Sequence, residues 1–180
     1  MQVRLDWKNN KLYCLKERAS STFWDEHWNS KSIEAPNVVI ETNLLGRCKK
    51  LLTGGNLVLG TTSKYLSKGS RLIEGGCGLA QNVSLLNEHG FKVTGVDYSE
   101  RTIALIKEKR PDLDIELGDV RDLRFKESEF DGYWSLGVIE HFWEGYDEIA
   151  EEMFRVLRPN GYLFLTFPSV SLLRRIKRGL

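Results

Sequence analysis

The sequence is poor in cysteine, has no long apolar run and carries no excess of one charge. Its three cysteines, Cys14, Cys48 and Cys77, are odd in number and lack the spacing of zinc ligands, so neither a disulfide framework nor a metal site is expected. No apolar run approaches the roughly 20 residues that cross a bilayer, and residues 1–7 lack the apolar core of a signal peptide. With 26 basic against 25 acidic residues, charge alone does not predict a nucleic-acid binder. We therefore expect a cytoplasmic protein with no nucleic-acid partner and no stable membrane insertion.

What the sequence does contain is typical of one globular domain. Hydrophobic residues make up 41% and charged residues 28% of the 180 positions, close to the averages of folded proteins. The pattern changes near residue 69. Residues 1–69 are irregular and aromatic, and we expect an N-terminal helical cap there, with helices near 38–52 and 57–66. Residues 70–180 are more regular and form the expected core.

Strand-like and helix-like segments alternate from residue 71 onward. The expected strands are 71–74, 91–96, 114–117, 130–136 and 162–167. The expected helices are 79–88, 99–109 with Ser99 as N-cap, and one from about 146, followed by a turn at 159–161. Such alternation is typical of a parallel sheet with helices on its faces. We predict a doubly wound, Rossmann-like α/β fold with a mostly parallel sheet.

Small and acidic residues follow the expected strands at their carboxyl ends. They are Glu74, Gly76, Gly78, Asp97, Asp119, Leu136 and Gly137. Ligands of open parallel sheets bind beyond this edge. Gly76 and Gly78 would let a ligand approach the backbone where a Cβ would obstruct it. Asp97 follows the Gly-rich turn by about 20 residues, the distance at which a carboxylate accepts hydrogen bonds from ribose hydroxyls.

Two nucleotide cofactors compete for this Gly-rich turn. A dinucleotide fingerprint that starts at Gly76 would need glycine at position 81, where Gln81 stands. The charge of Glu74 would repel a pyrophosphate but attract a cation. The ammonium and sulfonium groups of S-adenosylmethionine match that charge, with the carboxylate of the cofactor near the N-terminus of the next helix. The residues favour S-adenosylmethionine and leave a nicotinamide-dependent oxidoreductase as the alternative.

Five segments in this order resemble the class I S-adenosylmethionine-dependent methyltransferases, in particular those that act on small molecules. The segments are Glu74–Ala80, Val93–Ser99, Gly118–Val120, Phe130–Phe142 and Leu157–Leu163. Ala80 stands where the family has the last glycine of its loop, a departure that should be tolerated. The family's sheet has seven strands, whereas this chain stops soon after the expected fifth. We therefore expect a fragment of a longer enzyme, truncated after the fifth strand, rather than a shortened variant.

The resemblance implies a role for the residues after the first two strands of the core. Glu74 is the acidic residue before the loop, and the loop from Gly76 to Gly78 would contact the methionine moiety. Asp97 would hold the ribose hydroxyls, and Tyr98 would lie against adenine.

The resemblance also assigns residues after the third and fourth strands. Asp119 would accept a hydrogen bond from the adenine amino group, beside the backbone of Val120. Leu136 and Gly137 would line the methionine side and open toward the acceptor.

Residues outside the cofactor loops carry weaker indications. His141 follows the fourth strand and could take a proton near neutral pH, or it could pair locally. Trp24, His27 and Trp28 could form an aromatic lid, or they could be the small core of an amino-terminal helix.

We expect S-adenosylmethionine as cofactor, S-adenosylhomocysteine as product and a small-molecule acceptor. A non-catalytic S-adenosylmethionine-binding module is a further alternative, because fold alone does not fix function. The sequence leaves open the acceptor, the methylated atom and the oligomeric state.

Overall fold

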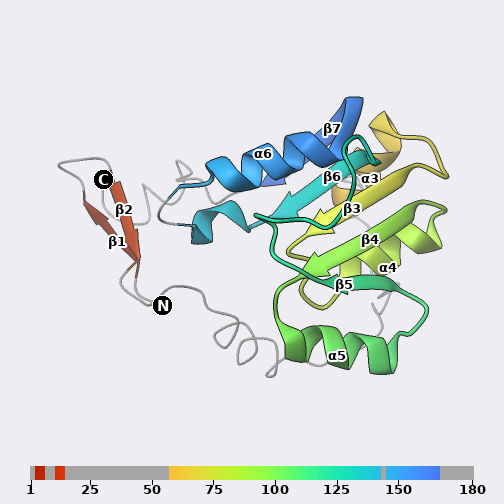
Figure 1. Cartoon of the computed structure of the whole chain (residues 1–180), viewed down its shortest axis with the longest axis horizontal. Coiled ribbons are helices and arrows are strands. Elements are labelled where there is room, and N and C mark those ends of the chain that lie inside the picture. The colour runs from red at the N-terminus through yellow and green to blue at the C-terminus, as the bar shows by residue number, and fades with distance from the viewer. Residues whose placement is uncertain (1–2, 7–10, 15–56, 143–144, 167–180) are drawn as a thin grey trace, which may run out of the picture.

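A computed structural model describes residues 3–6, 11–14, 57–142 and 145–166 (Figure 1). Its core is a sheet of five parallel strands in the order β5-β4-β3-β6-β7. The strands are β3 (Arg71–Gly75), β4 (Lys92–Asp97), β5 (Asp114–Leu117), β6 (Phe130–Leu136) and β7 (Leu157–Thr166). Because β3 lies between β4 and β6, the chain winds outward first in one direction and then in the other. The predicted doubly wound α/β fold is confirmed.

Helices cover both faces of this sheet. They are α3 (Leu57–Tyr65), α4 (Gln81–Glu88), α5 (Glu100–Lys109) and α6 (Asp147–Val156), with a short 3-10 helix, η1 (Ile139–His141). Apolar residues of α3, α4 and α5 pack on one face of the sheet together with Leu72. Apolar residues of α6 pack on the other face together with Ile73. Successive residues of β3 thus supply two separate cores, as the alternation of side chains along a strand requires.

The described part of residues 1–69 contains a hairpin as well as a helix. β1 (Val3–Asp6) and β2 (Lys11–Cys14) pair antiparallel, with Val3 opposite Cys14. Four-residue strands offer too few alternating positions for a sequence pattern to reveal them, and the sequence analysis did not predict this hairpin. The helix expected at 57–66 is confirmed as α3. The helix expected at 38–52 and the aromatic group Trp24, His27 and Trp28 lie outside the described residues, so the helical cap stays a prediction.

Strand β7 contains a bulge where the sequence predicts a turn. Phe130 pairs with Leu157, but the next pair along is Gly132 with Tyr162, so residues 158–161 protrude opposite a single residue of β6. Asn160 adopts a left-handed conformation with φ of 66°, which asparagine tolerates better than most residues. From Gly132 to Leu136 the register with β7 is regular. The break that the sequence predicts at 159–161 is therefore present as this bulge, and the strand differs from the prediction in beginning before the break, at Leu157.

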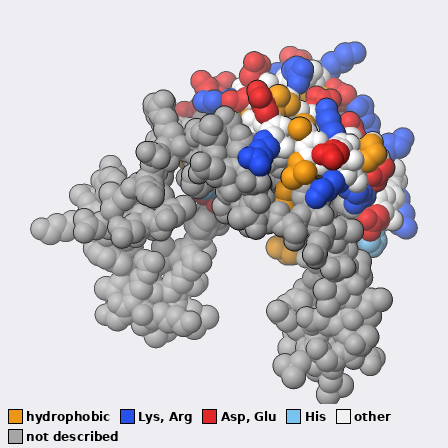
Figure 2. Space-filling view, turned by 90° about the horizontal axis from the view of Figure 1, so that it is seen from below, with side chains coloured by type: hydrophobic (Ala, Val, Ile, Leu, Met, Phe, Trp, Pro, Cys, Tyr) orange, Lys and Arg blue, Asp and Glu red, His pale blue; other side chains and the backbone are white. Residues whose placement is uncertain are grey.

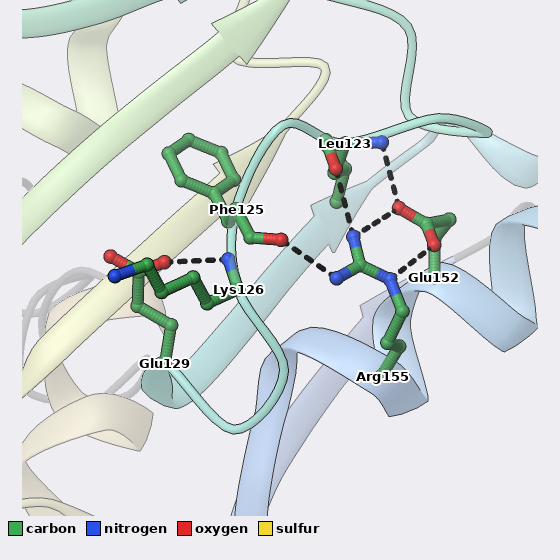
Figure 3. Close-up of polar contacts among 6 residues, drawn as sticks. All are labelled: Leu123, Phe125, Lys126, Glu129, Glu152 and Arg155. Atoms are coloured by element: carbon green, nitrogen blue, oxygen red, sulfur yellow. Dashed lines mark hydrogen bonds and ion pairs between the residues drawn. The ribbon is translucent and has the colours of Figure 1, made fainter.

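An arginine on α6 holds the loop between β5 and β6 (Figure 3). Arg155 donates to both carboxylate oxygens of Glu152, at 2.6 and 2.7 Å, and to the carbonyl oxygens of Phe125 and Leu123, at 2.7 and 2.8 Å. Glu152 in turn accepts from the backbone N–H of Leu123 at 2.7 Å. The Arg155 guanidinium holds the pKa of Glu152 below its ordinary range, against the effect of burial. These contacts fix a loop that otherwise has no regular secondary structure.

The surface of the described residues mixes both signs of charge. On the face seen in Figure 2, basic and acidic side chains lie interspersed, with isolated apolar groups between them. The near-balance of charge in the composition thus holds locally on this face. Among the helices that the structure describes, none combines the length and apolar character needed to cross a membrane.

We expect Arg155→Met to lower the free energy of unfolding by about 2 kcal/mol, because two carbonyls and a carboxylate lose a charged donor. Arg155→Lys should recover less than half of the loss, since one ammonium cannot reproduce the planar fork of the guanidinium. Urea denaturation measures both effects. Lys107→Met, which removes an exposed charge from α5, is the control. An equal loss of unfolding free energy in that variant would contradict a specific stabilising role of the Arg155 contacts.

Candidate functional site

The loops after β3, β4 and β6 begin at the same level of the sheet. Gly75 pairs with Val96 on one side and with Ser135 on the other. The parallel sheet therefore brings the carboxyl ends of these strands, and the loops that follow them, to one edge. The loop after β5 joins them, since the N–H of Gly118 donates to the carbonyl of Asp97 at 3.0 Å. All ten site residues that the sequence analysis named lie on these strand ends and loops.

The Gly-rich loop after β3 lies too close to its neighbours to carry side chains at its first two positions. A Cβ on Gly75 would collide with the hydroxyl of Tyr133, and one on Gly76 would meet Cγ2 of Val138 at 2.5 Å. Gly76 has a φ of 75°, which L side chains rarely adopt. Its N–H donates to the carbonyl of Val96 at 2.8 Å. Glycine is therefore required here by space as well as by conformation.

Ala80 occupies the position of the last glycine of the loop and takes up a glycine-like conformation. Its φ is 57° and its ψ is 27°, in the left-handed region, and its side chain is buried. The Ala80 N–H donates to the carbonyl of Cys77 at 2.9 Å, and its own carbonyl accepts from the N–H of Ser84 at 3.0 Å. These bonds hold an alanine in a conformation that costs an L-residue about 1–2 kcal/mol. The last position of the loop before α4 thus takes this conformation without glycine.

Asp97 connects the end of β4 with two loops. Its Oδ2 accepts from the N–H of Gly78 at 2.8 Å, and its Oδ1 accepts from the N–H of Ser99 at 3.0 Å. The side chain of Ser99 accepts from the N–H of Thr102 at 3.2 Å, which confirms Ser99 as the N-cap of α5. The Asp97 carboxylate is buried, with 6% of the residue exposed. Tyr98, beside it, is half-buried.

Glu74 is a buried acid with only one side-chain partner. Its Oε1 accepts from Nδ2 of Asn82 at 2.7 Å, whereas its Oε2 is buried with no hydrogen-bond partner among the described residues. Burial raises the pKa of Glu74 to about 7; the hydrogen bond from Asn82 opposes the rise and the charge of Asp97 adds to it. The sequence analysis missed Asn82. Its place in the first turn after a Gly-rich loop is the signal that could have identified it.

Further buried polar atoms lack partners near the same edge. Ser135 Oγ and Glu140 Oε2 have no hydrogen-bond partner within the described part of the chain. Ser135 pairs with Gly75 in the sheet, and Glu140 lies in η1, which follows β6. An unsatisfied buried polar atom costs about 1–3 kcal/mol. Such atoms gathered beside a Gly-rich loop fit a polar ligand, and the unpaired carboxyl oxygen of Glu74 fits a cationic group.

Asp119 already has a partner in the loop after β5. Arg121 donates to it through Nη2 at 2.6 Å and Nε at 3.0 Å, and its backbone N–H donates at 2.9 Å. Burial alone would raise the pKa of Asp119, but these bonds outweigh it and lower the pKa. Arg121 also lies over the ring of Phe142, 5.4 Å from the centroid. The sequence analysis did not foresee this pair; the side chain of Val120, between the two residues, is buried in the core of the α6 face.

The loop after β6 carries the remaining predicted residues. Gly137 has a φ of 70°, and its N–H donates to the carbonyl of Thr166 at 3.1 Å. Leu136 packs against the apolar core on the α3–α5 face. His141 ends η1 and is half-buried, and its N–H donates to the carbonyl of Val138 at 3.1 Å. The structure thus places His141 near the carboxyl edge of the sheet, a few residues beyond Gly137.

The sequence profile of one protein family matches residues 73–165, which is more than half of the chain and covers every loop described above. That family is described as a methyltransferase domain. The chain belongs to the class I S-adenosylmethionine-dependent methyltransferase family. This confirms the resemblance found in the five sequence segments.

Two curated relatives of this methyltransferase-family chain come from mycobacteria. A probable S-adenosylmethionine-dependent methyltransferase of Mycolicibacterium smegmatis is 33% identical over 101 residues, which are 56% of this chain and 39% of that protein. The phthiotriol/phenolphthiotriol dimycocerosates methyltransferase 1 of Mycobacterium ulcerans is 30% identical over 115 residues, 62% of this chain and 42% of that protein. The chain thus spans about two fifths of the length of these relatives.

Solved structures share the fold. The PH0226 protein of Pyrococcus horikoshii aligns with a TM-score of 0.54 and 25% identity, over 77% of this chain and 64% of that one. The [4+2]-cyclase SpnF aligns with a TM-score of 0.52 and 26% identity, over 65% of this chain and 44% of that one. A similar fold therefore occurs in a protein named for a reaction other than methyl transfer.

We expect Glu74→Gln to remove a loss of folding stability that the wild-type protein undergoes as the pH rises. Because the folded-state pKa of Glu74, about 7, lies above its ordinary value of 4.5, its contribution to stability is complete below about pH 4.5. That contribution falls as the pH rises through 7. The variant should gain up to about 3 kcal/mol on the wild type between about pH 5 and about pH 8.

Urea denaturation of both proteins at matched pH measures this difference and cancels the carboxylates that they share. A difference between the two proteins that does not change with pH would contradict the burial of an isolated carboxyl at this position.

Proposed function

We propose that this chain binds S-adenosylmethionine at the carboxyl edge of β3, β4 and β6 and transfers its methyl group to a small-molecule acceptor. The observation that carries the proposal is the buried Glu74 carboxyl, one oxygen of which has no hydrogen-bond partner among the described residues, beside a loop that Tyr133 and Val138 keep tight at Gly75 and Gly76. The unpartnered carboxyl oxygen supports a ligand that bears a cation. Family membership supports S-adenosylmethionine as that ligand and argues against a nicotinamide cofactor.

Different residues of the site would contact different parts of the cofactor. Glu74 would attract the ammonium group of the methionine moiety, and the loop from Gly76 to Gly78 would lie against that moiety. Asp97 accepts one backbone N–H on each carboxylate oxygen. A carboxylate oxygen can accept more than one hydrogen bond, and Asp97 would also accept the ribose hydroxyls, as the family resemblance implies. Tyr98 would lie against the adenine ring.

The other two loops would complete the site. Asp119, held in place by Arg121, would accept from the adenine amino group beside the Val120 backbone. Leu136 and Gly137 would border the methionine side and face the acceptor. When bound, S-adenosylmethionine supplies a methyl group activated by positive sulfur. The chain's own contribution is then to align the acceptor and exclude water.

His141 is the proposed proton acceptor. A base is needed only where the attacking atom of the acceptor starts protonated, and histidine accepts protons near neutral pH. Its position at the end of η1, beyond the loop that would face the acceptor, supports this role. Removal of a general base typically costs about 10²–10⁴-fold in rate.

Relatives support a small-molecule acceptor. The Mycobacterium ulcerans relative, and one from Mycobacterium tuberculosis that is 31% identical over 111 residues, are named for methylation of phthiotriol/phenolphthiotriol dimycocerosates. Neither name refers to a nucleic acid or a protein substrate. We accordingly propose a cytoplasmic enzyme with no nucleic-acid partner.

The experiment that tests the cofactor is calorimetric titration with S-adenosylhomocysteine and, separately, with NADH. Micromolar binding of S-adenosylhomocysteine alone is expected, and binding of NADH alone would overturn the assignment. Conversion of bound S-adenosylmethionine to S-adenosylhomocysteine in an acceptor screen then separates an enzyme from a non-catalytic binding module. The similarity to a cyclase makes this second step necessary, because fold does not fix the reaction.

We expect Asp97→Ala to weaken S-adenosylhomocysteine binding by about 1.5–3 kcal/mol, the range for hydrogen bonds to a charged group. Asp97→Asn should lose less, since the amide oxygen still accepts one of the two backbone N–H groups. Asp114→Asn is the matched control, because Asp114 accepts from Thr94 at the opposite edge of the sheet. Unchanged affinity in a folded Asp97→Ala protein would remove Asp97 from the ribose site.

We expect His141→Ala to leave S-adenosylhomocysteine affinity nearly unchanged and to lower turnover of a hydroxyl or amine acceptor by about 10²-fold or more. His89→Ala is the control, since His89 lies at the far end of α4, where its ring is hydrogen-bonded to the Leu85 carbonyl of its own helix. A large loss of cofactor affinity in His141→Ala would mean that His141 belongs to the cofactor site instead.

A further inference from the structure

Asn82 is the one side chain that the structure shows donating a hydrogen bond to Glu74. It lies in the first turn of α4, directly after the Gly-rich loop, and is half-buried. Its Nδ2 lies 2.7 Å from Oε1 of Glu74. Because Nδ2 is a donor in every protonation state of the protein, this contact favours an acceptor oxygen on Glu74. It also fixes which of the two oxygens is engaged.

The contact leaves the second oxygen of Glu74 unpaired. Oε2 is buried and has no hydrogen-bond partner among the described residues. The titratable group that acts on Glu74 is Asp97, at the end of β4, and Glu74 and Asp97 in turn act on Cys77, in the loop. Burial raises the pKa of the Cys77 thiol, and the charges of Glu74 and Asp97 raise it further, so this thiol stays neutral. Within the described residues, no cation is paired with Glu74.

We propose that Asn82 is a positioning residue that orients the Glu74 carboxyl and favours its ionised form. Asn82 thereby sets both the affinity of the site for an ammonium-bearing ligand and the pH below which that affinity falls. This inference rests on the proposed function, because the ligand is the methionine moiety of S-adenosylmethionine or its product.

The physical basis is a competition for the Glu74 carboxyl. Burial and Asp97 favour the protonated acid, whereas the Asn82 hydrogen bond and, to a smaller extent, the backbone hydrogen bond of Val83 favour the carboxylate. An ammonium group binds the carboxylate and must displace the proton when the pH lies below the pKa of free Glu74, about 7. The dissociation constant then rises by about tenfold for each pH unit below that value. Loss of the Asn82 amide raises the pKa of Glu74, so the rise should begin at a higher pH.

The test uses two ligands that share the nucleoside and the sulfur and differ in the amino-acid end, which carries the ammonium group. S-adenosylhomocysteine carries the ammonium, whereas 5′-methylthioadenosine keeps the adenine, ribose and sulfur but lacks the amino-acid end. Calorimetric titration of each ligand between about pH 6 and about pH 9 gives the two profiles. For the wild-type protein, the dissociation constant of 5′-methylthioadenosine should not change with pH. The dissociation constant of S-adenosylhomocysteine should begin to rise as the pH falls below about 7, and we call this pH the break of the profile.

Three variants of Asn82 separate positioning from a structural role. Asn82→Ala should weaken S-adenosylhomocysteine about tenfold at neutral pH and move the break upward by about one pH unit. Asn82→Asp is isosteric and suits the first turn of a helix, so it should fold, and its like charge should move the break at least as far. Asn82→Gln keeps the amide donor and should restore part of the wild-type profile. None of the three should change the affinity for 5′-methylthioadenosine.

Asn87 provides a matched control within the same helix. Its Oδ1 accepts from the N–H of Val93 at 3.0 Å, so Asn87→Ala removes a structural amide that has no contact with Glu74. This variant should keep the wild-type pH profile for both ligands even where it lowers the melting temperature.

The outcomes distinguish the inference from the proposed function. Equal weakening of both ligands in Asn82→Ala, or an unmoved break in Asn82→Asp, would overturn the positioning role while S-adenosylhomocysteine binding by the wild type upholds the cofactor site. A wild-type profile without a break would also overturn it. Absence of binding of either ligand to the wild type would overturn the proposed function and the inference with it.

Discussion

The end of β3 is where the structure has the least room, and the rest of the site depends on that constraint. β3 lies between β4 and β6. The side chain of Tyr133, in β6, occupies the space that a Cβ at position 75 would need, and the side chain of Val138, in the loop after β6, occupies the space that a Cβ at position 76 would need. The backbone must therefore turn on glycine, which keeps the loop close to the sheet and buries Glu74 beneath it. The loop leads directly into α4, and Asn82 in the first turn of that helix donates a hydrogen bond to Glu74, the acid that precedes the loop.

Three acids stand at three strand ends, and each is stabilised in a different way. Asp97 receives two backbone N–H groups and forms part of the scaffold of two loops. Asp119 receives a guanidinium and a backbone N–H, and it remains partly open to solvent. Glu74 receives the amide of Asn82 and a backbone hydrogen bond from Val83, and its Oε2 is buried with no hydrogen-bond partner among the described residues. A ligand group that pairs with this oxygen would remove the cost of leaving it buried without a partner.

Sequence patterns identified the core because each of its elements depends on local information. Apolar runs predicted β3 and β6, and Ser99 predicted the start of α5, since a buried strand and an N-cap are readable within a few residues. The Asn82–Glu74 and Asp119–Arg121 contacts depend on how loops fold over the sheet, which no local pattern encodes. The bulge at residues 158–161 was missed because proline, asparagine and glycine indicate a break in regular structure but not whether the strand resumes on the same path. The roles of individual site residues stay predictions.

The bulge in β7 marks a place where the chain could gain or lose residues without a change in the pairing of the sheet beside the site. Pairing with β6 is continuous from Tyr162 to Thr166, so a one-residue insertion in that stretch would reverse which face each side chain occupies. Phe164 would then leave Trp134, against which its ring stacks at a centroid distance of 4.5 Å. An insertion or deletion among residues 158–161 instead changes only a segment that already lies outside the ladder. A change in chain length at the bulge would therefore leave the pairing of Tyr162–Thr166 with β6 unchanged, and with it the register of the strand beside the site.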